Sequence, residues 1–139
     1  MDIDNIFSSL IKEIGYQNNK TVVINKVVMN SKEVEKNNLF VAIRGGNAYA
    51  NEALEKGAFV IYDDNTINLN SNPNSFLVDD SVKFMQKLAH QWRNTLNIKI
   101  IGITGSNGKT TVKDMVFQLL STKYKGKKTE GNYNNHIGL

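Results

Sequence analysis

The sequence has no cysteine, one proline and no long apolar run. Without cysteine the chain can form neither a disulfide nor a thiolate metal site, which agrees with a reducing compartment. No stretch approaches the ~18 apolar residues of a transmembrane helix, so we expect no membrane span. The acidic N-terminus, residues 1–4, is unlike a signal peptide. These absences favour a cytoplasmic protein.

Charge of one sign is also not concentrated in this chain. The formal net charge is only +4 over 139 residues. The one basic cluster, residues 123–128, is typical of a solvated connection after a helix. No interleaving of basic and aromatic residues like that of an RNA-binding sheet occurs. We therefore expect no nucleic-acid partner, whereas a mildly positive surface suits anionic small substrates such as nucleotides.

Helical and strand-like patterns alternate over the first two thirds of the chain. Apolar residues at helical spacing predict helices at 3–14, 50–56 and 82–93. Short apolar runs predict strands at 22–24, 27–29, 39–43, 58–62 and 76–78. The alternation predicts an α/β domain over residues 1–95, and the only proline, Pro73, lies in a predicted surface loop.

A different pattern begins at Ile98. The run 98–103 is β-branched and too short for a helix of its own, so it predicts a buried strand. Gly105 and Gly108 then predict a tight loop, and apolar residues at helical spacing from Val112 onward predict a helix. Strand, glycine loop and helix in this order form a phosphate cradle, because the loop N–H groups and the helix start converge on an anion.

The side chains of this loop suit a nucleotide triphosphate. Lys109 is placed to reach the β- and γ-phosphates and is the candidate catalytic residue, and the Thr110 hydroxyl is placed to ligate Mg²⁺. Thr111 is better suited to packing or capping the first helical turn. The candidate phosphate-binding residues are Gly105, Ser106, Asn107, Gly108, Lys109, Thr110 and Thr111, and the family resemblance given next implies that the nucleotide is ATP.

The loop departs from the general P-loop pattern, which would place a glycine where this chain has Ile103. Thr-Gly-Ser-Asn-Gly-Lys-Thr-Thr at 104–111 instead resembles the loop of the Mur ligase and folylpolyglutamate synthetase superfamily. Gly-Asn-Tyr-Asn-Asn-His-Ile-Gly at 131–138 resembles the MurF branch of the Mur ligases. Residues 30–58 resemble that family's uridine-nucleotide domain, so the resemblance covers nearly the whole chain.

The resemblance implies an α/β chain: a small uridine-nucleotide-binding domain over 1–95, then the truncated start of a P-loop central domain over 96–139. It implies an ATP- and Mg²⁺-dependent ligase of peptidoglycan synthesis that joins UDP-N-acetylmuramoyl-tripeptide to D-alanyl-D-alanine through an acyl phosphate. We expect the longer parent to be a monomeric enzyme. The 139-residue chain alone should be inactive, because most of the ATP site and the amine-binding domain would lie beyond it.

Six further residues are candidates for the substrate. Ser31, Arg44 and Gly45 are assigned to the uridine-diphosphate end. The amides of Asn132, Asn134 and Asn135 suit phosphate or sugar hydroxyls, although turn formation explains them nearly as well.

Two segments depart from the family pattern. Asn30-Ser31-Lys32 stands where the family commonly has Asp-Ser-Arg, and lysine lacks the two-pronged donor of arginine. Residues 47–51 lack the Asp-Gly-His of many relatives.

Two alternative functions stay open. One is another ligase of the superfamily, such as MurE or a folate ligase. The other is a nucleotide-binding fragment without catalysis.

Overall fold

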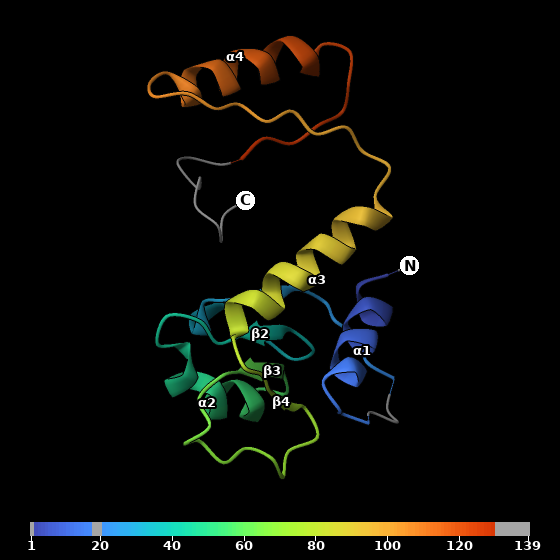
Figure 1. The fold of residues 1–139 in the computed structure, drawn as a ribbon, viewed down its shortest axis with the longest axis vertical. Helices are drawn as coiled ribbons and strands as arrows, with labels where there is room; N and C mark the ends of the chain where they lie inside the picture. The colour runs from blue at the N-terminus through green and yellow to red at the C-terminus, as the bar shows by residue number, and fades with distance from the viewer. Residues whose placement is uncertain (1, 18–20, 130–139) are drawn as a thin grey trace. The chain divides into compact units, whose positions relative to one another are not determined.

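The computed structural model describes residues 2–17 and 21–129. The chain divides into two compact units, Met1–Leu96 and Asn97–Leu139. In the described part of the first unit, a parallel sheet runs in the order β1–β2–β3–β4 (Figure 1). Its strands are β1 Val27–Val28, β2 Leu39–Val41, β3 Phe59–Tyr62 and β4 Ser75–Leu77. The predicted α/β class is confirmed for this unit.

Helices bury both faces of this sheet. The helices of the first unit are α1 Ile3–Glu13, α2 Ala50–Glu55 and α3 Ser81–Thr95, with short 3₁₀ helices η1 Ser31–Glu33 and η2 Gly46–Tyr49. Every residue of β2 and β3 is buried, as expected for a parallel sheet covered on both sides. α1 and α2 lie on opposite sides of the strands (Figure 1).

One face of the sheet packs on α1 and α3 through Phe7, which is fully buried. Its ring lies 6.2 Å from that of Phe59, 5.4 Å from that of Phe76 and 6.2 Å from that of Phe84. These contacts join α1 to β3, β4 and α3. The alternate residues of the strands, such as Phe40 and Val60, pack with α2 in the second layer of the core.

The predicted strand at 22–24 is wrong. Val22 and Ile24 are buried, whereas Val23 is exposed. However, the Ile24 N–H donates to the Asp4 carboxylate at 2.8 Å. Because this donor is bonded to a side chain, it is not available to a neighbouring strand, and pairing begins only at Asn25, whose N–H donates to the Asn37 carbonyl at 2.9 Å.

The second unit contains α4, Lys109–Ser121, as the apolar spacing predicted. The predicted buried strand at 98–103 does not form: Ile98, Ile100 and Ile101 are 52, 63 and 60% exposed. A strand needs a partner for its backbone groups, and residues 97–129 provide no strand for it. Residues 127–129 form no strand either. They contact α4 through a side-chain ion pair, in which Lys128 Nζ lies 2.6 Å from Asp114 Oδ1.

Candidate functional site

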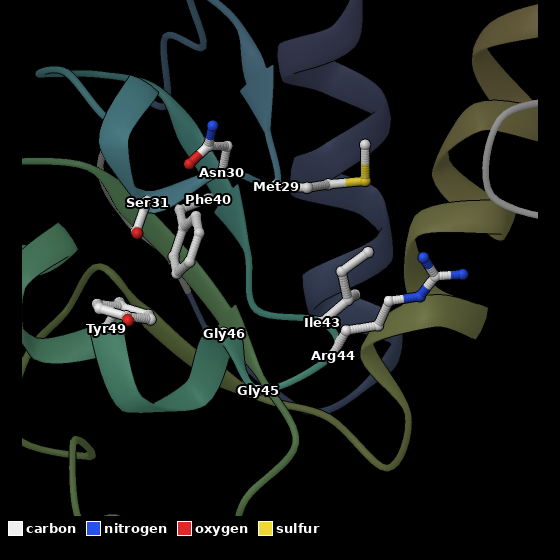
Figure 2. Close-up of a pocket in the computed structure, with 9 residues that line it drawn as sticks. All are labelled: Met29, Asn30, Ser31, Phe40, Ile43, Arg44, Gly45, Gly46 and Tyr49. Atoms are coloured by element: carbon white, nitrogen blue, oxygen red, sulfur yellow. The ribbon is translucent and has the colours of Figure 1, made fainter. Parts of the chain in front are cut away.

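A pocket of about 210 Å³ opens at the carboxyl end of β2 (Figure 2). It brings together Ser31, Arg44 and Gly45, the three residues assigned to the uridine-diphosphate end. The carboxyl edge of a parallel sheet is where open α/β folds bind ligands. The sequence did not assign the other residues that line it to the ligand: Met29, Asn30, Phe40, Ile43, Gly46 and Tyr49.

The rim of this pocket after β2 has an unusual backbone. Arg44 has a φ of 49° and Gly45 a φ of 85°, so two consecutive residues are left-handed. Such a φ suits glycine but is disfavoured for an arginine, whose Cβ approaches the backbone. The turn closes through a hydrogen bond of 2.9 Å from the Gly46 N–H to the Ile43 carbonyl. Residues 43–46 thus form a tight turn at the edge of the pocket.

The Asn30-Ser31-Lys32 segment forms the opposite rim. The Asn30 side chain caps η1 by accepting from the Lys32 N–H at 3.1 Å. Lys56 Nζ donates to the Ser31 carbonyl at 3.5 Å and so ties this rim to the end of α2. Asn30 therefore acts locally as a helix cap, which an aspartate at this position would do equally well.

The side chains of the pocket divide into two groups. In Figure 2 the Ser31 hydroxyl points toward the rings of Phe40 and Tyr49. The Arg44 guanidinium points away from Ser31 and Tyr49, although its residue lines the same pocket. The Tyr49 ring is 48% exposed and offers a flat apolar surface beside polar groups. The only sequence signal for Tyr49 was its position in the segment 47–51, which departs from the family pattern.

Two carboxylates that lie close in sequence to pocket residues are paired with lysines. Glu33 Oε2 lies 2.9 Å from Lys26 Nζ, and Glu52 Oε1 lies 2.7 Å from Lys56 Nζ. The Lys26 hydrogen bond, helped by the charge of Lys26, holds the pKa of the Glu33 carboxyl below its ordinary value. With these acids paired, the exposed Arg44 leaves the pocket suited to an anionic ligand.

The predicted phosphate loop lies in the second unit. α4 begins at Lys109 after Gly108, which has a φ of 76° and provides no side-chain cap. The first backbone N–H groups of a helix have no intrahelical acceptor, so they face the loop as donors. Gly105 has a φ of 151°, a conformation that side-chain-bearing residues rarely adopt. Residues 105–111 therefore form a glycine loop followed by an open helix start, the local geometry that a phosphate needs.

Lys109 is folded back over this loop. Its Nζ donates to the Gly105 carbonyl at 2.6 Å. The ammonium therefore lies beside the loop, next to Gly105. Because an ammonium has three donors, it can also donate to an anion bound in the loop.

The remaining assigned residues fall in two classes. Thr110 is exposed in the first turn of α4. The described ranges 2–17 and 21–129 contain no cluster of three histidine, cysteine or acidic residues that could hold a metal ion. Asn132, Asn134 and Asn135 lie outside the residues that the structure describes.

No helix in the described chain is both long and apolar enough to cross a membrane.

Comparison with known proteins places this geometry in context. Residues 103–139 match the family described as the Mur ligase middle domain. The chain is 41% identical over 122 residues to the UDP-N-acetylmuramoyl-tripeptide–D-alanyl-D-alanine ligase of Bacillus subtilis; the match covers 84% of this chain and 27% of the relative. It is 34% identical over 105 residues to the UDP-N-acetylmuramoyl-L-alanyl-D-glutamate–2,6-diaminopimelate ligase of Parabacteroides distasonis, covering 70% of this chain and 22% of the relative.

A solved structure gives the same result. The crystal structure of the MurF ligase from Thermotoga maritima in complex with ADP matches with a TM-score of 0.74 and 37% sequence identity. The match covers 86% of this chain and 28% of that chain. The chain thus spans about a quarter of the length of the relatives it matches.

Proposed function

The chain belongs to the Mur ligase family, and we propose that it contributes the uridine-nucleotide domain and the ATP phosphate loop of a ligase that joins UDP-N-acetylmuramoyl-tripeptide to D-alanyl-D-alanine. In this proposal residues 1–95 form the first domain and residues 96–139 begin the second. The observation that carries it is the glycine loop and helix start at 105–111, with the Lys109 ammonium held across the loop. The solved relative bound to ADP supports a nucleotide as the ligand of this loop.

The loop would hold ATP mainly through its backbone. The N–H groups of Ser106 to Thr111 and the positive end of the α4 dipole favour the phosphates. On binding, Lys109 exchanges the Gly105 carbonyl for a phosphate oxygen. Its charge then stabilises the phosphoryl group as it is transferred to the substrate carboxylate, since phosphoryl transfer depends mainly on positioning and charge neutralisation.

A divalent ion fits this arrangement in one way only. Thr110 offers a single hydroxyl, and no acidic cluster is present among the described residues to form a complete protein site. Mg²⁺ commonly takes few protein ligands and completes its shell with nucleotide phosphates and water. We propose Thr110 as its protein ligand from this chain. Bound there, the ion would neutralise phosphate charge.

The pocket of the first unit would hold the uridine diphosphate. Tyr49 and Phe40 provide ring surfaces, Ser31 provides a hydroxyl, and the bend at Arg44–Gly45 lines the pocket with backbone. Asn132, Asn134 and Asn135 stay candidates for phosphate or sugar hydroxyls. We expect a cytoplasmic, monomeric parent enzyme without a nucleic-acid partner, and no catalysis by the 139 residues alone.

A second candidate is the branch that adds diaminopimelate, because such a ligase also matches the chain, at lower identity. The two differ in the incoming amine. Supplying the full-length parent with D-alanyl-D-alanine or with diaminopimelate, and identifying the product by mass spectrometry, separates them. Formation of the D-alanyl-D-alanine product alone is the result we expect.

Substitution of Lys109 tests the role of the loop. Lys109→Ala in the full-length parent should lose transition-state stabilisation on the order of 3 kcal/mol, or about 100-fold in turnover. Lys99→Ala, which removes an exposed lysine near the loop, is the matched control and should leave turnover unchanged. Amide formation by Lys109→Ala at the rate of the control would exclude the assigned role.

A further inference from the structure

Three hydrogen bonds meet at the residue after β3. Asn47 Nδ2 donates to Asp63 Oδ1 at 2.7 Å, and the Asp63 N–H donates back to Asn47 Oδ1 at 3.3 Å. The other carboxylate oxygen, Asp63 Oδ2, accepts from the Ser81 N–H at 3.0 Å. We call this set the Asn47–Asp63–Ser81 clamp. It joins three segments far apart in sequence at the carboxyl edge of the sheet.

Each end of the clamp has a defined place in the fold. Asn47 lies in η2, directly after the pocket residues Gly45 and Gly46. Asp63 follows β3, and Ser81 is the first residue of α3. The clamp therefore ties the pocket rim to the centre of the sheet and to the start of a fifteen-residue helix.

The rim needs such a support. Two consecutive left-handed residues, Arg44 and Gly45, precede Asn47, and a left-handed arginine persists only where its surroundings hold it. The hydrogen bonds within the bend, such as Gly46 N–H to the Ile43 carbonyl, are local and do not attach it to the sheet. The last sheet bond before the bend is from the Ala42 N–H to the Ile61 carbonyl at 2.9 Å. The Asn47 side chain provides the next attachment to the β3 segment.

We propose that Asn47 and Asp63 are positioning residues of the nucleotide pocket: they hold the Arg44–Gly46 bend in the geometry that receives a nucleoside diphosphate. This inference rests on the proposed role of the pocket. The two residues do not line the pocket, so they act through the bend rather than by contact with the ligand. A preformed rim raises affinity because less conformational freedom is lost on binding.

The donors and acceptors of the clamp make a sharp test possible. In Asp63→Asn, the amide oxygen of residue 63 can accept from the Ser81 N–H, but its NH₂ then faces the NH₂ of Asn47 and the bond between these two side chains is lost. If the Asn47 amide turns over to restore that bond, its NH₂ faces the backbone N–H of residue 63 and the bond from this N–H is lost. One hydrogen bond is therefore lost in either orientation. In Asn47→Asp, two carboxylates face each other. The double variant Asn47→Asp with Asp63→Asn restores all three bonds and the original net charge.

Binding of uridine diphosphate to the 139-residue chain, measured by calorimetry, gives the first readout. Asp63→Asn should weaken binding by about tenfold, as expected for the loss of one hydrogen bond to a charged group. This variant removes a negative charge, which by itself would favour an anionic ligand. The double variant should return to within about threefold of the original affinity, since all three bonds are present again.

Amide hydrogen exchange gives a second readout that needs no ligand. Exchange of the Gly46 amide should be faster in each single variant and normal in the double variant, while the Val60 amide in β3 stays unchanged in all. A circular-dichroism spectrum shows that each variant is folded, and Asn47→Ala replaces any single variant that is not. Equal uridine diphosphate binding by all variants, or a double variant no better than the singles, overturns the proposal.

The two proposals fail in different ways. If the original chain does not bind uridine diphosphate, the nucleotide role of the pocket is wrong. Exchange at Gly46 then still decides the clamp: acceleration in the singles with recovery in the double supports a positioning role for the bend. Unchanged exchange refutes it.

Discussion

Arg44 carries a conformational cost that a pair of substitutions can measure. Its φ of 49° places a side-chain-bearing residue in the left-handed region, which costs an L-residue roughly 1–2 kcal/mol. Glycine avoids this cost but loses more chain entropy on folding, by roughly 0.5–1 kcal/mol. Arg44→Gly should therefore be more stable than Arg44→Ala by about 0.75 kcal/mol, the difference between the midpoints of those two ranges. Both variants lack the guanidinium, so the comparison isolates the backbone.

Thermal unfolding of the first unit, followed by circular dichroism, is the assay. For a unit of this size the difference corresponds to roughly 3–6 °C in Tm. Arg93 in α3 provides the matched control, because it has helical neighbours and no positive φ. There glycine should be less stable than alanine by about 1 kcal/mol, so the order of the two variants reverses. Equal Tm values for Arg44→Gly and Arg44→Ala, or a more stable alanine variant, would refute the argument from φ.

Two further predictions concern the start of α3. The Ser81 hydroxyl is fully buried and has no hydrogen-bond partner among the described residues, so Ser81→Ala should leave stability unchanged or raise it by up to about 1 kcal/mol in urea unfolding; a clear loss of stability would show that the hydroxyl has a partner. The Lys83 N–H donates to the Asp80 cap and lowers the pKa of that carboxyl below its ordinary 3.8. Asp80 therefore adds stability that is complete above its unfolded-state pKa and is lost as the pH falls through its lower folded-state pKa. Asp80→Asn keeps a cap without a titrating group, so its urea midpoint should fall less between pH 7 and pH 3 than that of the original chain; identical falls would contradict the assignment.

The helices of the chain were predictable because their signals are local. The apolar residues of α1, Ile6, Phe7, Leu10 and Ile11, recur at helical spacing, and all four are buried. Gly15, with a φ of 91°, follows directly after the predicted helix at 3–14. The signals of α2 and α3 are local in the same way: their apolar residues, and the Asp80 cap of α3, lie within one or two turns of each other.

The strands were predicted less well because an apolar run does not show which other segment it pairs with. The runs at 39–43 and 58–62 pair in register, Phe40 opposite Val60, and form the centre of the sheet. The run at 98–103 has four isoleucines but finds no strand in the described part of its unit, so it stays exposed. The run at 22–24 forms no strand, and its Ile24 N–H donates to the Asp4 carboxylate instead of to a neighbouring strand.

The sequence by itself determined the glycine loop that we propose as the phosphate site, because the seven residues from Gly105 to Thr111 are consecutive and their geometry follows from two glycines and a helix start. Only the tertiary structure decided the pocket and its clamp. Asp63 lies sixteen residues after Asn47 and eighteen residues before Ser81. No local sequence pattern indicates that these three residues are in contact. The sheet brings them together because parallel strands end at one edge, and that proximity is a property of the packed chain rather than of any segment of it.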